Sequence, residues 1–348
     1  MNKRVVLGLS GGVDSAVAAG LLLEQGCEVY GHWLDIGLGG ERDARQVAER
    51  LGIPFSVGDI RRELEEQVKE PFRRDYLAGR TPLPCARCNP TVKFPALFRR
   101  ACEVGADWVA TGHYARIRQG PRGEAILCRG EPRNDQAYML ARLPRAWLPR
   151  ILFPLGDYEK SAVRELAREL GIPVADKPDS MEICFIPDGD YAAWLDRRGG
   201  VPPPGNFTDR TGNVLGRHRG FHHYTIGQRR GLGLPAEHRL YVSEIRPEDN
   251  TVVLSDGSDL MADAVRGEEF NLLSDVRDGE EVTVRLRHSR NETPARFYRE
   301  ETGGRLELLE PARAPTPGQL AVLYRQDAVL GSLWITSAHR VSEGSPAL

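Results

Sequence analysis

The sequence predicts an α/β protein with a helix-covered parallel sheet, followed by a small central domain and a C-terminal β-barrel. Strand-like apolar runs alternate with helical segments from residue 5 to about residue 112, a pattern typical of parallel sheets. Beyond about residue 200, short alternating segments bounded by Pro and Gly dominate, and these are typical of small barrels. We therefore expect three domains, at residues 1–200, 201–265 and 266–348.

The elements of the first domain follow from hydrophobic periodicity. Val5–Leu9 is an apolar run that fits a buried strand, and Ala16–Leu23 fits a buried helix. We expect further strands at 28–33, 54–58 and 108–110, and helices at 43–51, 61–77, 94–104 and 159–170. Ligands of parallel sheets gather at the carboxyl ends of the strands, where Leu34, Asp35 and Gly112 fall.

The second half of the chain has a different pattern of predicted secondary structure. Val201-Pro202-Pro203-Pro204-Gly205 interrupts the chain and marks the end of the first domain. Short alternating segments at 282–287, 305–309, 321–324 and 329–335 predict the strands of the barrel.

Composition restricts the class of protein. Of the 348 residues, 41% are hydrophobic and 28% are charged, as in ordinary globular proteins. No apolar run approaches the roughly 20 residues of a membrane span, and Met1-Asn2-Lys3-Arg4 leads directly into a strand. We therefore expect a cytoplasmic protein without a membrane partner. The net charge of −2 means that any nucleic-acid surface must be local.

The hexapeptide Ser10-Gly11-Gly12-Val13-Asp14-Ser15 lies between the first strand and the first helix. Its glycines lack a Cβ, so backbone N–H groups can approach phosphate oxygens, and the helix N-terminus adds partial positive charge. No Lys follows the glycines, so the loop is not of the G-x-x-x-x-G-K-[ST] type, and it is not G-x-G-x-x-G. We expect it to bind a nucleotide phosphate.

This loop resembles the SGGxDS loop of the ATP-pyrophosphatases, whose fold is similar to that of the adenine nucleotide alpha hydrolases. The resemblance implies that ATP is cleaved between its α- and β-phosphates and that a carbonyl or carboxylate oxygen is adenylated. Asp14 then acts at the Mg²⁺ or pyrophosphate site, although a residue that opens a helix can instead simply cap it. The expected ATP-binding residues are Gly8, Leu9, Ser10, Gly11, Gly12, Val13, Asp14, Ser15, Leu34 and Gly112.

Two further segments carry thiols. Cys85 and Cys88 lie in a loop that Pro82 and Pro84 stiffen, and Cys184 lies in the segment 179–186. With the segments 111–116, 134–136, 153–158, 224–231 and 317–319, they make the whole chain similar to the bacterial tRNA-specific 2-thiouridylase family (MnmA, TrmU).

This resemblance implies an ATP-dependent sulfurtransferase that replaces the C2 oxygen of the wobble uridine of tRNA by sulfur. The family adenylates that oxygen, a sulfur nucleophile attacks C2, and AMP leaves. By similarity, Cys88 is the nucleophile and Cys184 carries the sulfur as a persulfide, whose release requires a disulfide with a second thiol. The loops of Cys88 and Cys184 must then meet. The implied partners are a persulfide donor and the tRNAs for glutamate, lysine and glutamine, and we expect a monomer.

An alternative use of the thiols is a [4Fe–4S] cluster. Many family members have Asp where this chain has Cys85, so Cys85, Cys88 and Cys184 offer three thiolate ligands and leave one iron open for sulfide. Two other rivals are a small-molecule ligase of the argininosuccinate-synthase type and a non-catalytic tRNA- or metal-binding protein with the same fold. The ligase does not explain Cys88, Cys184 or the basic second half.

Further positions are expected to contact tRNA by similarity. His113 follows a strand where the family contacts the base, although a loop histidine satisfied by the backbone is the alternative. Leu83 and Asn134 depart from the usual Asn and Lys of the family. The implied tRNA-binding residues are Leu83, Pro84, Cys85, His113, Asn134, Asp135, Gln136, Arg229, Arg230 and Gln319.

The segment 201–240 is locally basic, with six arginines against Asp209 and Glu237. Phe207, Phe221 and Tyr224 interleave with this charge, so we expect stacking on RNA bases as well as phosphate binding, whereas a solvated charged face is the alternative. A second basic stretch at 285–290 would place tRNA against the barrel.

Overall fold

A five-stranded parallel sheet forms the first part of the computed structural model, which describes residues 3–340 except 176, 178–182, 236–237 and 290. The strand order is β3-β2-β1-β4-β7, and every pairing is parallel. The strands are β1 (Arg4–Gly8), β2 (Glu28–Asp35), β3 (Phe55–Asp59), β4 (Trp108–Ala110) and β7 (Ile151–Leu152). The predicted parallel sheet is confirmed.

Helices cover both faces of this sheet, because alternate residues of β1 point to opposite sides. Val5 and Leu7 join a core with α1 (Val13–Glu24), α2 (Glu41–Leu51) and α8 (Lys160–Glu169). Val6 joins a second core with α6 (Phe94–Val104). The carboxyl ends of β1, β2 and β4 lie at the same edge of the sheet, because its strands are parallel.

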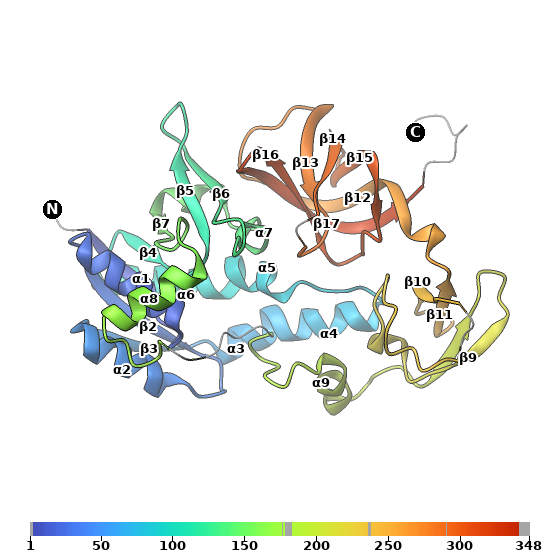
Figure 1. Ribbon diagram of the computed structural model, residues 1–348, viewed down its shortest axis with the longest axis horizontal. Coiled ribbons are helices and arrows are strands. Elements are labelled where there is room, and N and C mark those ends of the chain that lie inside the picture. Colours follow the sequence, from blue (N-terminus) through green and yellow to red (C-terminus); the bar gives the residue numbers. More distant parts are fainter. Residues whose placement is uncertain (1–2, 176, 178–182, 236–237, 290, 341–348) are drawn as a thin grey trace.

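The predicted polar helix over 61–77 contains a π-helical segment. It consists of α3 (Arg61–Leu64), η1 (Glu65–Lys69) and α4 (Glu70–Leu77). Pro71 lacks an N–H for the preceding turn, and a wider turn accommodates this loss. Figure 1 shows α4 extending from the sheet toward the central domain.

The loop predicted around the first two cysteines is a helix instead. Pro84 occupies the first turn of α5 (Pro84–Cys88), where its fixed φ is compatible with a helix. The π-helical η2 (Asn89–Lys93) continues into α6. Cys85 and Cys88 are therefore held on a helix.

The C-terminal barrel is also confirmed. Its strand order is β12-β15-β14-β13-β16-β17, and a β12–β17 pairing closes the ring. The strands are β12 (Met261–Leu272), β13 (Glu280–Arg285), β14 (Thr293–Arg299), β15 (Gly303–Arg313), β16 (Leu320–Arg325) and β17 (Ala328–His339). β12 begins before residue 266, so the barrel starts earlier than the predicted limit.

A hairpin of the first part reaches this barrel, a feature that the sequence analysis missed. β5 (Ala115–Gln119) pairs with β6 (Ala125–Arg129), and Cys128 of β6 pairs with Ala328 of β17. Two short helices follow β6 in the chain, α7 (Ala137–Leu140) and η3 (Arg145–Arg150). A third, η5 (Ser258–Leu260), directly precedes β12.

The central domain is a four-stranded sheet in the order β10-β11-β8-β9. It comprises β8 (Gly205–Thr208), β9 (Val214–His218), η4 (Phe221–His223), β10 (Tyr241–Arg246) and β11 (Thr251–Ser255), and α9 (Tyr191–Arg198) precedes it. Phe207, Phe221 and Tyr224 form its core and are at most 3% exposed. The prediction that these rings stack on RNA bases is therefore wrong, because their spacing reflects burial.

Candidate active site

The glycine loop joins β1 to α1 with a geometry that requires glycine. Gly11 has a φ of +73°, and a Cβ there would lie 2.9 Å from the backbone nitrogen of Ala44. The hydroxyls of Ser10 and Ser15 lie 3.0 Å apart, and Ser15 Oγ donates to the carbonyl of Gly12. A Cβ on Gly112 would lie 2.8 Å from the nitrogen of Ser15, so the loop after β4 packs closely against the same turn.

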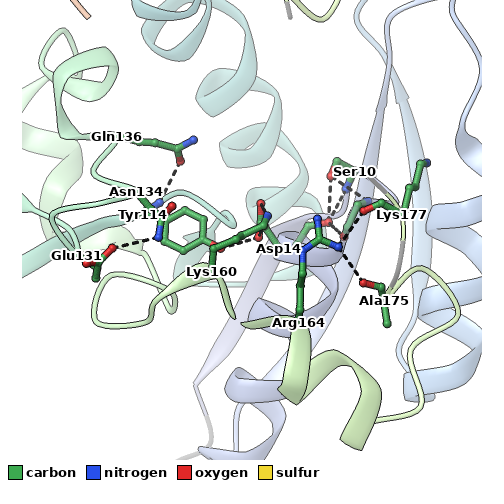
Figure 2. A network of polar contacts seen from close by, with 12 residues as sticks. Ser10, Asp14, Tyr114, Glu131, Asn134, Gln136, Lys160, Arg164, Ala175 and Lys177 are labelled. Atoms are coloured by element: carbon green, nitrogen blue, oxygen red, sulfur yellow. Dashed lines mark hydrogen bonds and ion pairs between the residues drawn. The ribbon is translucent and has the colours of Figure 1, made fainter. Parts of the chain in front are cut away.

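Asp14 faces a lysine from a distant helix. Lys160 Nζ lies 2.6 and 2.8 Å from the two carboxylate oxygens of Asp14, and Tyr114 Oη donates to Oδ1 at 2.7 Å (Figure 2). The N-cap of α1 is Gly12, and no side chain caps this helix. The capping alternative for Asp14 is therefore wrong. No local sequence signal indicated Lys160, which lies 146 residues away.

A second lysine adds positive charge to the glycine loop. Lys177 Nζ lies 2.6 Å from Asp43 Oδ2 and 3.5 Å from the carbonyl of Gly11. Arg164 Nη1 donates at 3.2 Å to the carbonyls of Ala175 and Lys177, which fixes this segment beside α8 (Figure 2). The cations and the N-terminus of α1 suit an anionic ligand.

A groove lies between the end of β2 and the start of α2. It is lined by Trp33, Asp35, Gly37, Gly39, Gly40, Glu41, Arg42, Arg45 and Arg61. Asp35 Oδ1 accepts from the backbone of Gly37, which shapes the turn. Leu34, expected to touch ATP, is half-buried and packs against the hydrophobic cluster that contains Cys88.

The segments of Cys88 and Cys184 meet in this structure. Cys88 packs against the same cluster as Ile183, Phe185 and Ile186. The sulfur relay requires such a meeting, while the roles of the two thiols stay predictions. All six cysteines are free thiols here.

The thiols are held in their neutral form. Burial raises the pKa of Cys88 to about 12, and the neighbouring Cys184 and Cys85 also raise it. Burial likewise raises the pKa of Cys85 and of Cys184, although Cys184 keeps an exposed surface. Lys93 acts in the opposite direction and lowers the pKa of all three. Lys93, which the sequence analysis missed, is therefore the cation that acts on all three thiols, and Lys69 acts on Cys184 as well.

The spacing of the thiols bears on metal binding. In the part of the chain that the structure describes, their sulfurs do not all lie within 4.8 Å of one another. A single zinc ion needs sulfurs about 4 Å apart, so this spacing does not fit one. A four-iron cluster spans more widely placed thiolates, and three cysteines match its usual donors.

Several expected tRNA contacts join the thiol helix to the barrel. Gln319 Nε2 donates to the carbonyls of Thr81 and Pro82, at 2.9 and 3.3 Å. Leu83 packs against the core shared by α6 and the barrel, and Pro84 is buried. These three side chains position the segment before Cys85.

The 134–136 segment also binds protein groups. Asp135 Oδ2 accepts from Arg285 Nη1 at 2.7 Å, and the two side chains are 5% and 7% exposed. Gln136 Oε1 accepts from the backbone of Tyr114, and Asn134 Nδ2 donates to Glu131 (Figure 2). The expectation that Arg285 offers charge to tRNA is therefore wrong.

The other candidates lie in different surroundings. His113 Nδ1 lies 2.7 Å from Thr111 Oγ1, and its ring packs between Phe94 and Phe153. Burial lowers the pKa of His113 well below its usual range, so the ring is neutral. Arg229 and Arg230 are exposed on the central domain, whereas Arg287 bonds to Ile226 and Thr316.

Three family models match consecutive parts of the chain. The tRNA methyl transferase HUP domain matches residues 3–188, the tRNA methyl transferase PRC-barrel domain residues 193–256, and the aminomethyltransferase beta-barrel domain residues 262–335. No helix among the described residues is long and apolar enough to cross a membrane.

Curated relatives match almost the whole length. The tRNA-specific 2-thiouridylase MnmA of Carboxydothermus hydrogenoformans is 44% identical over 94% of this chain and 96% of that protein. The protein of the same name from Lachnoclostridium phytofermentans is 42% identical over 94% of this chain and 98% of its own. A solved 4-thiouridine synthetase with RNA and ATP aligns at 18% identity and a TM-score of 0.35, over 56% of this chain and 50% of that one, which is too distant to inform the site.

Proposed function

Because the chain belongs to the tRNA-specific 2-thiouridylase family, we propose that it catalyses ATP-dependent 2-thiolation of the wobble uridine of tRNA in the cytoplasm. The observation that carries this proposal is the pairing of two sites in one domain. A phosphate-type glycine loop with Asp14 and Lys160 lies at the carboxyl edge of the sheet. Cys88 packs in one cluster with Leu34 of β2 and with Ile183 and Phe185, which flank Cys184.

The first step activates a poor electrophile. The C2 oxygen of uracil attacks the α-phosphorus of ATP, the bond to the β-phosphate oxygen breaks, and pyrophosphate leaves. Backbone N–H groups of the glycine loop, Lys160 and Lys177 stabilise the negative charge that develops. Asp14 is the carboxylate suited to hold Mg²⁺, which when bound neutralises phosphate charge.

The second step transfers sulfur. The terminal sulfur of a Cys184 persulfide attacks C2, a C–S bond forms, and the C2–O bond breaks to release AMP. The Cys88 thiolate then attacks Cys184 Sγ and leaves the electron pair of the old S–S bond on the 2-thiouridine sulfur. The resulting Cys88–Cys184 disulfide is reduced by a cellular dithiol. The high pKa of Cys88 keeps this thiol unreactive in the tRNA-free protein.

A second mechanism has an observation in its favour. Cys85 belongs to the same cluster of interacting thiols, yet it takes part in no step of the persulfide route. Cys85, Cys88 and Cys184 would hold a [4Fe–4S] cluster, which when bound supplies an open iron for sulfide. The protein groups around the thiols, including Lys93, are the same in both mechanisms.

The tRNA is expected to approach the exposed Arg229 and Arg230 of the central domain and to present its anticodon between the glycine loop and the thiols. We propose the tRNAs for glutamate, lysine and glutamine as substrates, a persulfide protein as the sulfur donor, and a monomer as the active form.

The test combines one reaction with two variants. Iron-free protein is incubated with ATP, Mg²⁺, a persulfide donor and unmodified glutamate tRNA, and the digested nucleosides are analysed by mass spectrometry. The persulfide route predicts 2-thiouridine that is lost in Cys184→Ser and retained in Cys85→Ser. Product that appears only after iron–sulfur reconstitution, and is lost in Cys85→Ser, supports the cluster. No product under either condition contradicts the proposed function.

A further inference from the structure

Two histidines and one carboxylate gather away from the thiols and the glycine loop. Asp196 lies near the end of α9, and His222 and His223 form the end of η4 in the central domain. One atom from each of the three residues lies within 4.8 Å of the others. The cluster therefore joins two segments that the proline run 202–204 separates in sequence.

The carboxylate of Asp196 lies between the two imidazoles. Its Oδ1 lies 2.9 Å from His222 Nε2, and its Oδ2 lies 3.6 Å from His223 Nε2. The two rings are 4.3 Å apart, centroid to centroid. His222 Nε2 therefore carries the proton of its hydrogen bond to this carboxylate, whereas His223 Nε2 lies beyond hydrogen-bond distance. A single cation bound by all three groups takes the place of that hydrogen bond, and the ring proton of His222 moves to Nδ1.

The two imidazole rings are shielded from water, whereas the carboxylate is partly exposed. The His222 side chain is 1% exposed and that of His223 10%, whereas that of Asp196 is 46% exposed. The Nδ1 atom of His222 is buried without a hydrogen-bond partner in the described structure. No contact on that side therefore fixes the tautomer, and Nε2 is able to present its lone pair.

The exposed side of the cluster opens into a cavity of about 580 Å³. Asp196 and His223 line it together with Tyr191, Arg219, Thr225 and Gln228. The cavity gives a metal ion a path of entry and leaves room for water as a further ligand. Two imidazoles, one carboxylate and an open position are a donor set that zinc accepts.

We propose that Asp196, His222 and His223 bind one divalent transition-metal ion, of which Zn²⁺ is the best match to these donors. The ion links α9 to η4 across the proline run 202–204. The site is distinct from the thiol cluster and does not depend on the reaction proposed above.

The experiment removes the competing thiols first. Tag-free full-length protein with Cys85→Ser, Cys88→Ser and Cys184→Ser is stripped with EDTA and titrated with Zn²⁺ or Co²⁺, followed by metal analysis and visible absorption. We expect one ion per chain, a Co²⁺ spectrum without sulfur ligation, and a Zn²⁺-dependent rise in melting temperature.

Variants then locate the ion. His222 is buried, so the informative changes are Asp196→Asn and His223→Gln, each of which should weaken Zn²⁺ binding at least about tenfold and remove the thermal shift. His238→Gln, an exposed histidine of the same domain, is the matched control and should bind Zn²⁺ like the parent. Absence of binding by the folded parent, or unchanged binding by both variants, overturns the proposal.

Discussion

Lys160 and Asp14 form an ion pair at 2.6 Å that joins α8 to the glycine loop across 146 residues. The pair is partly buried, with side-chain exposures of 20% and 34%. It places a cation beside the N-terminus of α1, where the phosphates of ATP are proposed to bind. The glycine loop could be recognised in the sequence, whereas no sequence pattern indicated that Lys160 would contact it.

Lys160→Met should reduce tRNA-dependent AMP formation by about 10²–10³-fold, because it removes a positive charge that stabilises the developing phosphate charge. The measurement is AMP release with saturating tRNA. Glu165→Gln, an exposed change on the same helix, is the control. Equal rates for Lys160→Met and the control would show that Lys160 has only a structural role.

The alkylation of Cys88 should depend steeply on pH. Because burial raises the pKa of Cys88 to about 12, iodoacetamide should react slowly near neutral pH and faster with every step toward that value. Lys93→Met should slow the reaction further, because loss of the cation disfavours the thiolate, whereas Lys93→Arg should not. Exposed Cys102 serves as the internal reference. Labelling of Cys88 that saturates near the pKa of a free thiol, about 8.5, contradicts this prediction.

Asp135→Ala should destabilise the protein by about 3–5 kcal/mol, because it leaves the buried guanidinium of Arg285 without its partner. Urea unfolding measures the change. Asp157→Ala removes a carboxylate that is 78% exposed and pairs with Arg116, so it should cost less than about 1 kcal/mol. A similar small cost for both variants would mean that the buried pair does not support the junction with the barrel.

Gln319→Leu should loosen the segment that precedes the thiols. Two hydrogen bonds to Thr81 and Pro82 are lost, so amide exchange over residues 81–88 should accelerate about tenfold. Hydrogen-exchange mass spectrometry reports this segment directly. Gln119→Leu on β5, an exposed position, is the control and should leave the segment unchanged. Identical exchange rates in both variants would mean that Gln319 does not position the helix that carries Cys85 and Cys88.

Arg229→Glu with Arg230→Glu should weaken tRNA binding and reduce its dependence on salt. Each lost phosphate contact lowers the slope of log affinity against log salt by about 0.7–0.9. Filter binding at several salt concentrations measures both quantities. Arg277→Glu on the barrel is an exposed control. An unchanged slope in the double variant would place the tRNA on another surface.

Local patterns predicted the sheet, the glycine loop and the barrel, because apolar periodicity and glycine spacing are properties of neighbouring residues. The pairs Lys160–Asp14 and Arg285–Asp135 join positions about 150 residues apart, and no local signal marks such partners. The same limit of local patterns explains why the prediction for Phe207 and Tyr224 was wrong. Aromatic residues among arginines have the pattern of an RNA surface, and only the folded domain shows that their rings form its core.

The most direct test of the account follows the oxygen that is removed. Glutamate tRNA with oxygen-18 at C2 of the wobble uridine is thiolated with unlabelled ATP, and the AMP is analysed by mass spectrometry. Adenylation of the C2 oxygen predicts that the heavy oxygen appears in AMP in step with 2-thiouridine. The formation of 2-thiouridine with unlabelled AMP, or of AMP without 2-thiouridine, would contradict the central claim that ATP activates this oxygen for sulfur transfer.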